Sequence, residues 1–131
     1  MRLTAEARKD PTRVRLTLEN DSDDPVTVVT SVNTGSRVDH DWFSIVVRVA
    51  GLERLLRFTG RRGASGPRKE TIEPRGLKRF VVDLAFWAQQ TVNGTKKLPK
   101  GPATITATYE VTDHPGVWNG KIDSNEIAID L

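Results

Sequence analysis

The chain has 131 residues, with 20 basic and 17 acidic side chains and no cysteine. This length fits a single domain over residues 1–131 that buries one hydrophobic core. The lack of cysteine excludes a disulfide framework and zinc sites built from thiolates. The net charge of +3 is too small to favour a nucleic-acid partner.

The sequence carries no targeting or membrane signal. Its N-terminal segment lacks the apolar stretch of a secretory signal, and no apolar run reaches the roughly 20 residues of a membrane-spanning helix. A chain free of cysteine also suits a reducing compartment. We therefore expect a cytoplasmic protein with no membrane span.

Short β-strands are predicted along the first half of the chain. Residues 2–8 alternate loosely between apolar and polar side chains, and residues 13–19 alternate regularly through Val14, Leu16 and Leu18. After a turn rich in Asp and Asn, further strands are predicted at residues 26–32, 42–50 and 52–58. The second of these is apolar on both faces, which indicates a central position, and the third also fits a short helical turn.

The second half ends in the clearest β pattern of the chain. Residues 103–112 alternate strictly, and after a turn at 113–116 the alternation returns through Ile127, Ile129 and Leu131. Ahead of this hairpin the sequence predicts a basic glycine-rich loop, an edge segment, a strand, a helical turn and a long loop, at residues 60–68, 70–72, 77–86, 85–90 and 93–102.

These elements predict an all-β protein. Seven or eight short strands with turn signals between them and no long helix are typical of a two-sheet antiparallel sandwich of immunoglobulin-like type. A closed barrel is the alternative. The motif Trp118-x-Gly120-Lys121-x-x-Ser124-Asn125 lies in the closing hairpin, where we interpret Gly120 and Asn125 as turn or bulge residues.

Four groups of residues resemble a known family. They are Val14-x-Leu16-Thr17-Leu18-x-Asn20-x-Ser22-x-x-Pro25-Val26-Thr27-Val28, Glu70-Thr71-Ile72-x-Pro74, Phe80-x-Val82-x-Leu84 and Leu98-Pro99-x-Gly101. Together they resemble the immunoglobulin-like domain of bacterial intracellular proteinase inhibitors and related bacterial modules, over roughly residues 13–111. The resemblance implies a non-catalytic sandwich that binds proteins, and it assigns no inhibitory loop to particular residues.

Two groups of polar residues have the chemistry of a metal site. Asp21, Asp23 and Asp24 offer oxygen ligands to calcium, but the ligand spacing of an EF-hand is missing, which favours a solvated turn. His40 and His114 each adjoin Asp residues and would form a metal site or a catalytic base if the fold joined them. No metal-binding or nucleophile motif accompanies them, so surface histidines are favoured, and we expect no metal, cofactor or catalytic residue.

The stretch between Gly51 and Phe80 carries nine basic residues and three acidic ones. Such a local excess favours an acidic protein partner, while few aromatic residues are present there to stack on bases, so nucleic acid is not expected. The glycines at 60, 63 and 66 lack the Gly-Lys-Ser/Thr ending of a phosphate loop.

The aromatic residues offer a second kind of contact. Exposed rings stack on sugars, whereas buried rings fill the space between two sheets. We assign Tyr109, Trp42 and Trp118 to the core or its rim. Trp87 lies beside Gln89 and Gln90 and is the predicted exposed contact.

The sequence therefore favours a non-catalytic protein-binding module, either a proteinase inhibitor or an assembly component, in an oligomeric state left open. The alternatives are a carbohydrate or cell-surface binding module and a small metal-dependent enzyme. The predicted contact loops are 33–41 and 60–68. The predicted partner-binding residues are Arg37, His40, Arg61, Arg62, Arg68 and Trp87.

Overall fold

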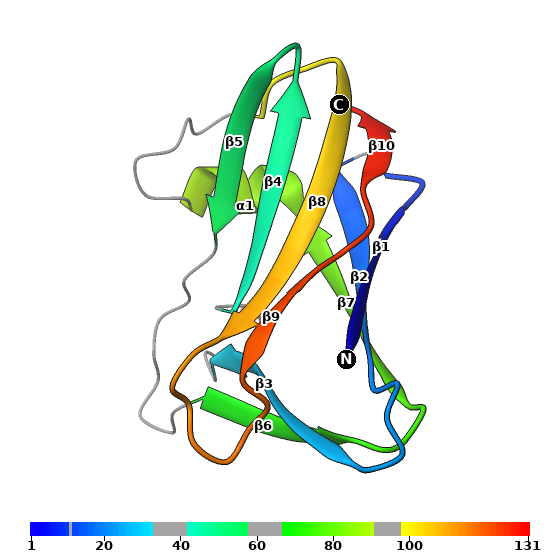
Figure 1. Cartoon of the computed structure of the whole chain (residues 1–131). Coiled ribbons are helices and arrows are strands. Elements are labelled where there is room, and N and C mark those ends of the chain that lie inside the picture. The colour runs from blue at the N-terminus through cyan, green and yellow to red at the C-terminus, as the bar shows by residue number, and fades with distance from the viewer. Residues whose placement is uncertain (11, 33–41, 58–66, 91–97) are drawn as a thin grey trace.

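The computed structural model describes residues 1–10, 12–32, 42–57, 67–90 and 98–131 (Figure 1). Its elements in chain order are β1 (Arg2–Ala7), β2 (Arg13–Glu19), β3 (Val26–Val32), β4 (Phe43–Val49), β5 (Leu52–Arg57), β6 (Pro67–Ile72), β7 (Leu77–Asp83), α1 (Leu84–Gln90), β8 (Pro102–Val111), β9 (Gly120–Asp123) and β10 (Ile127–Asp130). The paired strands run antiparallel. The prediction of an all-β fold is confirmed, with more strands than the seven or eight expected.

The strands form three hydrogen-bonded sheets, where the sequence predicted two. One sheet has the order β1-β2-β7, and a second has the order β10-β8-β4-β5 with β9 also paired to β8. The third sheet is the pair β3-β6. Since β3 follows β2 and β6 precedes β7, the pair β3-β6 continues the ladder of β2 and β7 beyond a bend, as Figure 1 shows.

Asn20 builds the bend between these two ladders, which we call the corner (residues 20–25 and 73–76). Its backbone N–H donates to Gly76 O at 2.9 Å, and its side-chain amide donates to Asp24 O at 2.8 Å and to Ile72 O at 2.9 Å. Its Oδ1 accepts from the backbone N–H and the hydroxyl of Ser22. Asn20 is 0 % exposed. The other residues of the corner are half-buried or exposed, so the corner is a surface turn held by one buried asparagine whose polar groups are paired.

The core lies between the sheets and is filled by the alternating apolar residues that the sequence indicated. Its main contributors on β2, β4 and β8 are Val14, Leu16, Leu18, Phe43, Ile45, Val47, Ile105, Ala107 and Tyr109, all buried. The Phe43 ring lies 5.2 Å from that of Phe80 and 4.8 Å from that of Tyr109, so an aromatic cluster joins three strands. β4 lies between β8 and β5, which confirms its predicted central position.

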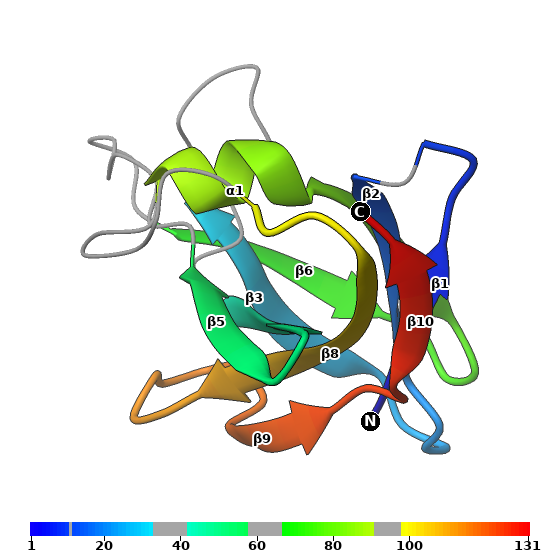
Figure 2. The same cartoon turned by 90° about the horizontal axis from the view of Figure 1, so that it is seen from above.

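Helix α1 closes one side of the core. It begins directly after β7, where Asp83 Oδ1 accepts the backbone N–H of Phe86 at 3.2 Å as a capping side chain does. The predicted helical turn is thus confirmed, whereas the strand ends at Asp83 instead of Phe86. The helix contacts both β5 and β7, which end different sheets, and it spans the gap between them (Figure 2).

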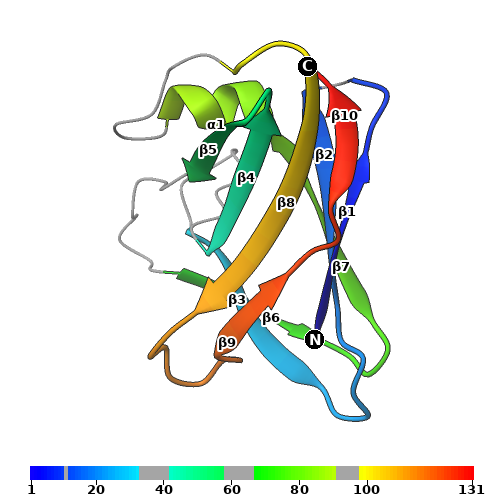
Figure 3. The same ribbon diagram turned by 45° about the horizontal axis from the view of Figure 1, so that its top comes forward.

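The opposite side of the core is closed by side chains that imitate a strand pair. Asn125 Oδ1 accepts the backbone N–H of Ala5 at 2.8 Å, and its Nδ2 donates to Ala5 O at 3.1 Å. The segment that carries Asn125 joins β9 to β10, and β10 lies beside β1 (Figure 3). Asp123 pairs with Thr108 and Ile127 with Ile105, so residues 124–126 lie opposite only two residues of β8, and the predicted bulge at Asn125 is confirmed. Its amide has a second role that the sequence did not predict, because it links the first strand to the closing hairpin.

Candidate functional site

The predicted contact loops fall mostly outside the described residues. Loop 33–41, with Arg37 and His40, and the part of the second loop that holds Arg61 and Arg62 are not described. Arg68 lies in β6, and only the backbone of this residue is described. These residues remain predictions.

Trp87 is not an exposed contact. It is 2 % exposed, and the neighbouring Leu84 and Ala88 of α1 are also buried. The prediction was wrong because the polar residues after Trp87 suggested a surface turn, whereas the helix turns the indole into the gap between β5 and β7. Burial here depends on which face of the helix meets the sheets, and seven residues of sequence do not fix that face.

Charged residues of the corner pair with each other. The Arg75 guanidinium lies 2.7 Å from the Asp23 carboxylate and donates to Asp21 O at 2.7 Å. Further along the chain, Lys78 forms an ion pair with Glu70. A cation already lies on the Asp23 carboxylate, which does not favour calcium there, and within the described ranges no group of three or more His, Asp or Glu residues is placed to hold a metal ion.

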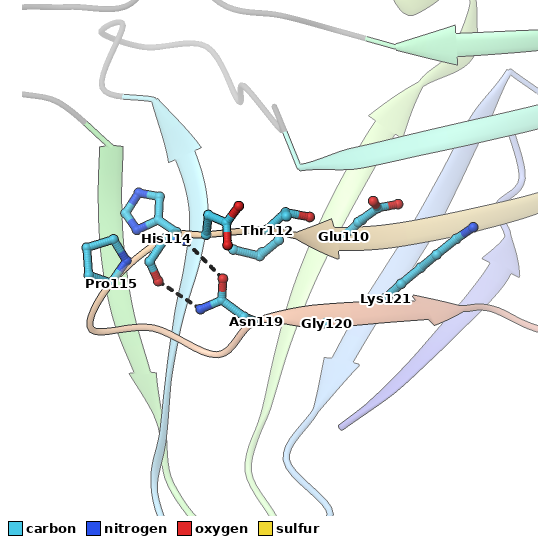
Figure 4. Close-up of a pocket in the computed structure, with 9 residues that line it drawn as sticks. Glu110, Thr112, His114, Pro115, Asn119, Gly120 and Lys121 are labelled. Atoms are coloured by element: carbon cyan, nitrogen blue, oxygen red, sulfur yellow. Dashed lines mark hydrogen bonds between the residues drawn. The ribbon is translucent and has the colours of Figure 1, made fainter.

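The β8–β9 connection forms the larger of two hollows that meet at the end of the largest sheet. Its volume is ≈ 780 Å³, and Figure 4 shows its lining side chains. They are Glu110, Val111, Thr112, Asp113, His114, Pro115, Asn119, Gly120 and Lys121. The side chains of Glu110 and Lys121 belong to residues directly opposite each other on β8 and β9. This hollow therefore offers an acid and a base side by side.

Asn119 fixes the shape of this connection. Its Oδ1 accepts the backbone N–H of His114 at 2.9 Å, and its Nδ2 donates to His114 O at 2.8 Å (Figure 4). The Nδ2 also donates to Val117 O at 2.8 Å. Asp113 and Gly116 have φ values of 52° and 79°, so the predicted turn is confirmed. Three bonds from one amide hold the turn in a single arrangement.

The turn presents His114 to Trp42. The two ring centroids are 6.0 Å apart and the rings meet edge to face at 80°. The Nδ1 atom of His114 is buried and has no hydrogen-bond partner in the part of the chain that the structure describes. Because His40 lies outside that part, the predicted pairing of the two histidines stays a prediction.

The second hollow has a volume of ≈ 400 Å³ and is lined by Trp42, Phe43, Ser44, Leu55, Arg57, Glu110 and Thr112. It shares Glu110 and Thr112 with the first hollow. We call the lining residues of both hollows the hairpin-end surface. This surface combines an indole, an imidazole, a guanidinium, an ammonium and a carboxylate, groups that are able to stack, to pair with charges and to form hydrogen bonds.

The motif that begins at Trp118 stabilises the fold, as the sequence suggested. The Trp118 ring stacks on Tyr109 with centroids 5.6 Å apart and an interplanar angle of 17°, and the backbone N–H of Trp118 donates to Thr27 O at 2.8 Å. Gly120 has a φ of 154°, and a Cβ there would lie 2.8 Å from the Trp118 ring. The Tyr109 hydroxyl in turn donates to Val29 O at 2.6 Å. These contacts hold the pair β3-β6 against β8.

Sequence patterns missed most of the hairpin-end surface. Glu110 and Thr112 belong to the polar face of an alternating strand, and nothing in that alternation separates them from other solvated residues. The available signal was the Pro115-Gly116 turn followed by Asn119-Gly120, which marks an ordered connection.

Within the described residues, no helix has the length and apolar character required to cross a membrane. No protein-family model, curated protein or solved structure matches the chain.

Proposed function

We propose that this chain is a non-catalytic protein-binding module that acts in the cytoplasm and contacts its partner through the hairpin-end surface. The observation that carries the proposal is the meeting of two hollows at Glu110 and Thr112, with Trp42 and Arg57 in one and His114 and Lys121 in the other. Tryptophan and arginine near the centre of a hollow, surrounded by polar groups, are typical of protein-binding hot spots.

The finer architecture that we propose is an immunoglobulin-like sandwich. The corner supports it, because it makes β3-β6 the bent continuation of β2-β7 and so leaves two layers around the core. The resemblance to bacterial intracellular proteinase inhibitors supports inhibition or assembly as the outcome of binding. The basic excess between Gly51 and Phe80 supports a partner with an acidic surface.

The test reverses charges on the hairpin-end surface. The full chain is immobilised, proteins are captured from a lysate of the native host, and each is quantified by mass spectrometry against two variants, Glu110→Lys and Lys121→Glu. Both positions are exposed, so the fold is retained. We expect at least one captured protein to lose about tenfold in affinity, equal to about 1.4 kcal/mol, when calorimetry compares the variants with the wild type.

A matched control changes a charge at the other end of the same sheet. Asp130 is exposed on β10 opposite Pro102, so Asp130→Lys is expected to leave binding unchanged. Equal binding of every captured protein by all these variants would refute the placement. If the captured protein is a protease, its hydrolysis of a peptide substrate in the presence of the chain decides between inhibition and assembly.

A second candidate function is carbohydrate binding, favoured by Trp42 in a hollow with Arg57 and Glu110. Trp87 does not support it because the indole is buried, and the Trp118 ring is stacked on Tyr109. A glycan array is the direct measurement. Binding of a glycan that quenches tryptophan fluorescence in the wild type but not in Trp42→Phe would support this function, and an array without hits would remove it.

A further inference from the structure

Strand β5 ends the largest sheet and carries the most exposed apolar side chains of the described chain. It pairs with β4, no other described strand pairs with it, and α1 contacts it from the gap between β5 and β7 (Figure 2). Leu52 and Leu55 are 53 % and 54 % exposed, compared with 46 % for Leu77 and 41 % for Val81. An edge strand with exposed leucines is a template for pairing with another strand.

The outer face of β5 carries a short symmetrical pattern. Val46 and its neighbours Ser44 and Arg48 point away from the core, since Phe43, Ile45 and Val47 are buried. On β5, Arg57 lies opposite Ser44, Leu55 opposite Val46, and Glu53 opposite Arg48. The outer face of β5 therefore carries an acid, a leucine and a base in chain order. When two such strands run antiparallel with their leucines opposite each other, each acid lies opposite a base.

We propose that β5 pairs antiparallel with β5 of a second copy of this chain, about a two-fold axis at Leu55. In this register Leu55 faces the second copy's Leu55, and Glu53 faces the second copy's Arg57. Leu55 and Arg57 also line the second hollow, so this dimer would compete with a partner bound there. The reciprocal pair of Arg57 with the second copy's Glu53 follows from the symmetry. Apolar and opposite-charge pairs directly across an antiparallel ladder stabilise it.

The charge pattern also selects the register. An axis at Glu53 would oppose two carboxylates, and an axis at Arg57 would oppose two guanidinium groups, which destabilises pairing. A shift by one residue would place the outer face of one copy beside the inner face of the other. The axis at Leu55 is therefore the favoured two-fold register.

An ion pair between β4 and β5 extends into a row of charges across the proposed junction. Arg48 Nε lies 3.1 Å from Glu53 Oε2 within one copy. A carboxylate accepts from several donors, so Glu53 is able to bind Arg48 and the second copy's Arg57 together. The dimer thus adds alternate charges to an ion-pair row that each copy already has.

Two other edge strands, β1 and β7, are less suited to this role. β1 is occupied by the amide of Asn125 through Ala5. On β7, an axis at Val81 would also oppose Arg79 and Asp83, but Asp83 is half-buried where it caps α1, and Val81 is less exposed than Leu55. Val81 therefore provides a matched control position, exposed and apolar on an edge strand without this junction.

The first test is sedimentation equilibrium of the full chain from about 10 µM to about 1 mM, because one short strand pair buries little area and predicts weak association. We expect a dimer whose fraction rises with concentration. Leu55→Asp opposes two carboxylates at the axis and is expected to abolish it, whereas Val81→Asp leaves it. A monomer at every concentration would overturn the proposal, as would loss of the dimer in Val81→Asp alone.

The second test uses the absence of cysteine from the chain. Residues that face each other across an antiparallel pair have Cα atoms about 4.5–5.5 Å apart, within the range of a disulfide. Mild oxidation is expected to cross-link Leu55→Cys at least fivefold faster than Val81→Cys. Equal rates would contradict the register.

The third test exchanges the charges. Glu53→Arg and Arg57→Glu each oppose like charges, and each is expected to weaken the dimer about tenfold. The double variant restores opposite pairs and is expected to recover most of the affinity. Thermal unfolding of each variant checks the fold, and a double variant weaker than both single variants would contradict the pairing.

Discussion

Two asparagines do the same chemical task in two regions with different consequences. Asn20 in the corner and Asn119 in the β8–β9 connection each bond through the side-chain amide to several backbone groups. Asn20 is buried and reaches Ile72, which is 52 residues away in sequence. Asn119 is exposed and reaches only as far as His114. One joins two ladders, and the other shapes a local turn.

The comparison teaches that the contribution of a polar side chain to stability depends on whether water is able to replace it as a hydrogen-bond partner. The bond from Asn20 to Ile72 O is buried, so this carbonyl would lose its donor away from water if Asn20 were removed, whereas Asp24 O keeps the Ser22 hydroxyl as a donor. The backbone groups that Asn119 satisfies lie at an open hollow, where water is able to take its place. We therefore expect changes at Asn20 to lower the stability of the fold, whereas the hairpin end is open to solvent and to a partner.

The largest expected effect separates the two asparagines directly. Asn20→Asp keeps the shape of the side chain. It replaces the Nδ2 group, which donates to Asp24 O and Ile72 O, by a buried carboxylate oxygen that cannot donate. We expect a loss of about 3–5 kcal/mol in the free energy of unfolding, measured by urea denaturation. A loss below about 1 kcal/mol would show that the corner is hydrated and that the comparison fails.

Tyr109→Phe tests the bond that holds β3 against β8. The change leaves Val29 O without its donor inside the core, and we expect a loss of about 1–3 kcal/mol in the free energy of unfolding. A similar stability for both proteins would indicate that another group satisfies this carbonyl. The far-ultraviolet spectrum serves as the control for the fold.

The same residue predicts a pH dependence. Burial raises the pKa of Tyr109 well above its ordinary value of 10.0, so the folded state favours the neutral phenol. Its contribution to stability is complete below pH 10 and falls as the pH rises further, since only the unfolded chain then ionises readily. Tyr109 is the single tyrosine, so absorbance at about 295 nm reports it alone. Ionisation that precedes unfolding would contradict this prediction.

Gly120→Ala tests the Trp118 stack at the hairpin end. The new methyl group would lie 2.8 Å from the indole at a φ of 154°, so either the ring or the backbone must move. We expect a cost of about 1–3 kcal/mol. Tryptophan fluorescence is expected to shift with it, and an unchanged spectrum would show that the ring does not lie over Gly120.

The smallest expected effect completes the comparison. Asn119→Asp exchanges the donor to His114 O and Val117 O in an exposed turn, and we expect a loss of at most about 1 kcal/mol in stability. The turn then loosens, and binding through the hairpin-end surface is expected to weaken. A loss as large as that of Asn20→Asp would contradict the distinction between the two regions.

Local patterns in the sequence determined the strands. Val14, Leu16 and Leu18 on β2 and the strict alternation of β8 predict half-buried strands, because a period of two places every second side chain on one face. The run that forms β4 is apolar on both faces and predicts its central position. The glycine at 120 likewise indicates the special backbone that the structure shows.

Only the tertiary structure decided the residues whose role depends on distant partners. Asn125 meets Ala5 from 120 residues away, and Asn20 meets Ile72 across the corner, so neither role is visible in its neighbours. Trp87 is buried because α1 fills the gap between two edge strands. Alternation fixes which face a residue takes, whereas the partner on that face follows from how the strands pair and pack, which is set by contacts far apart in the chain.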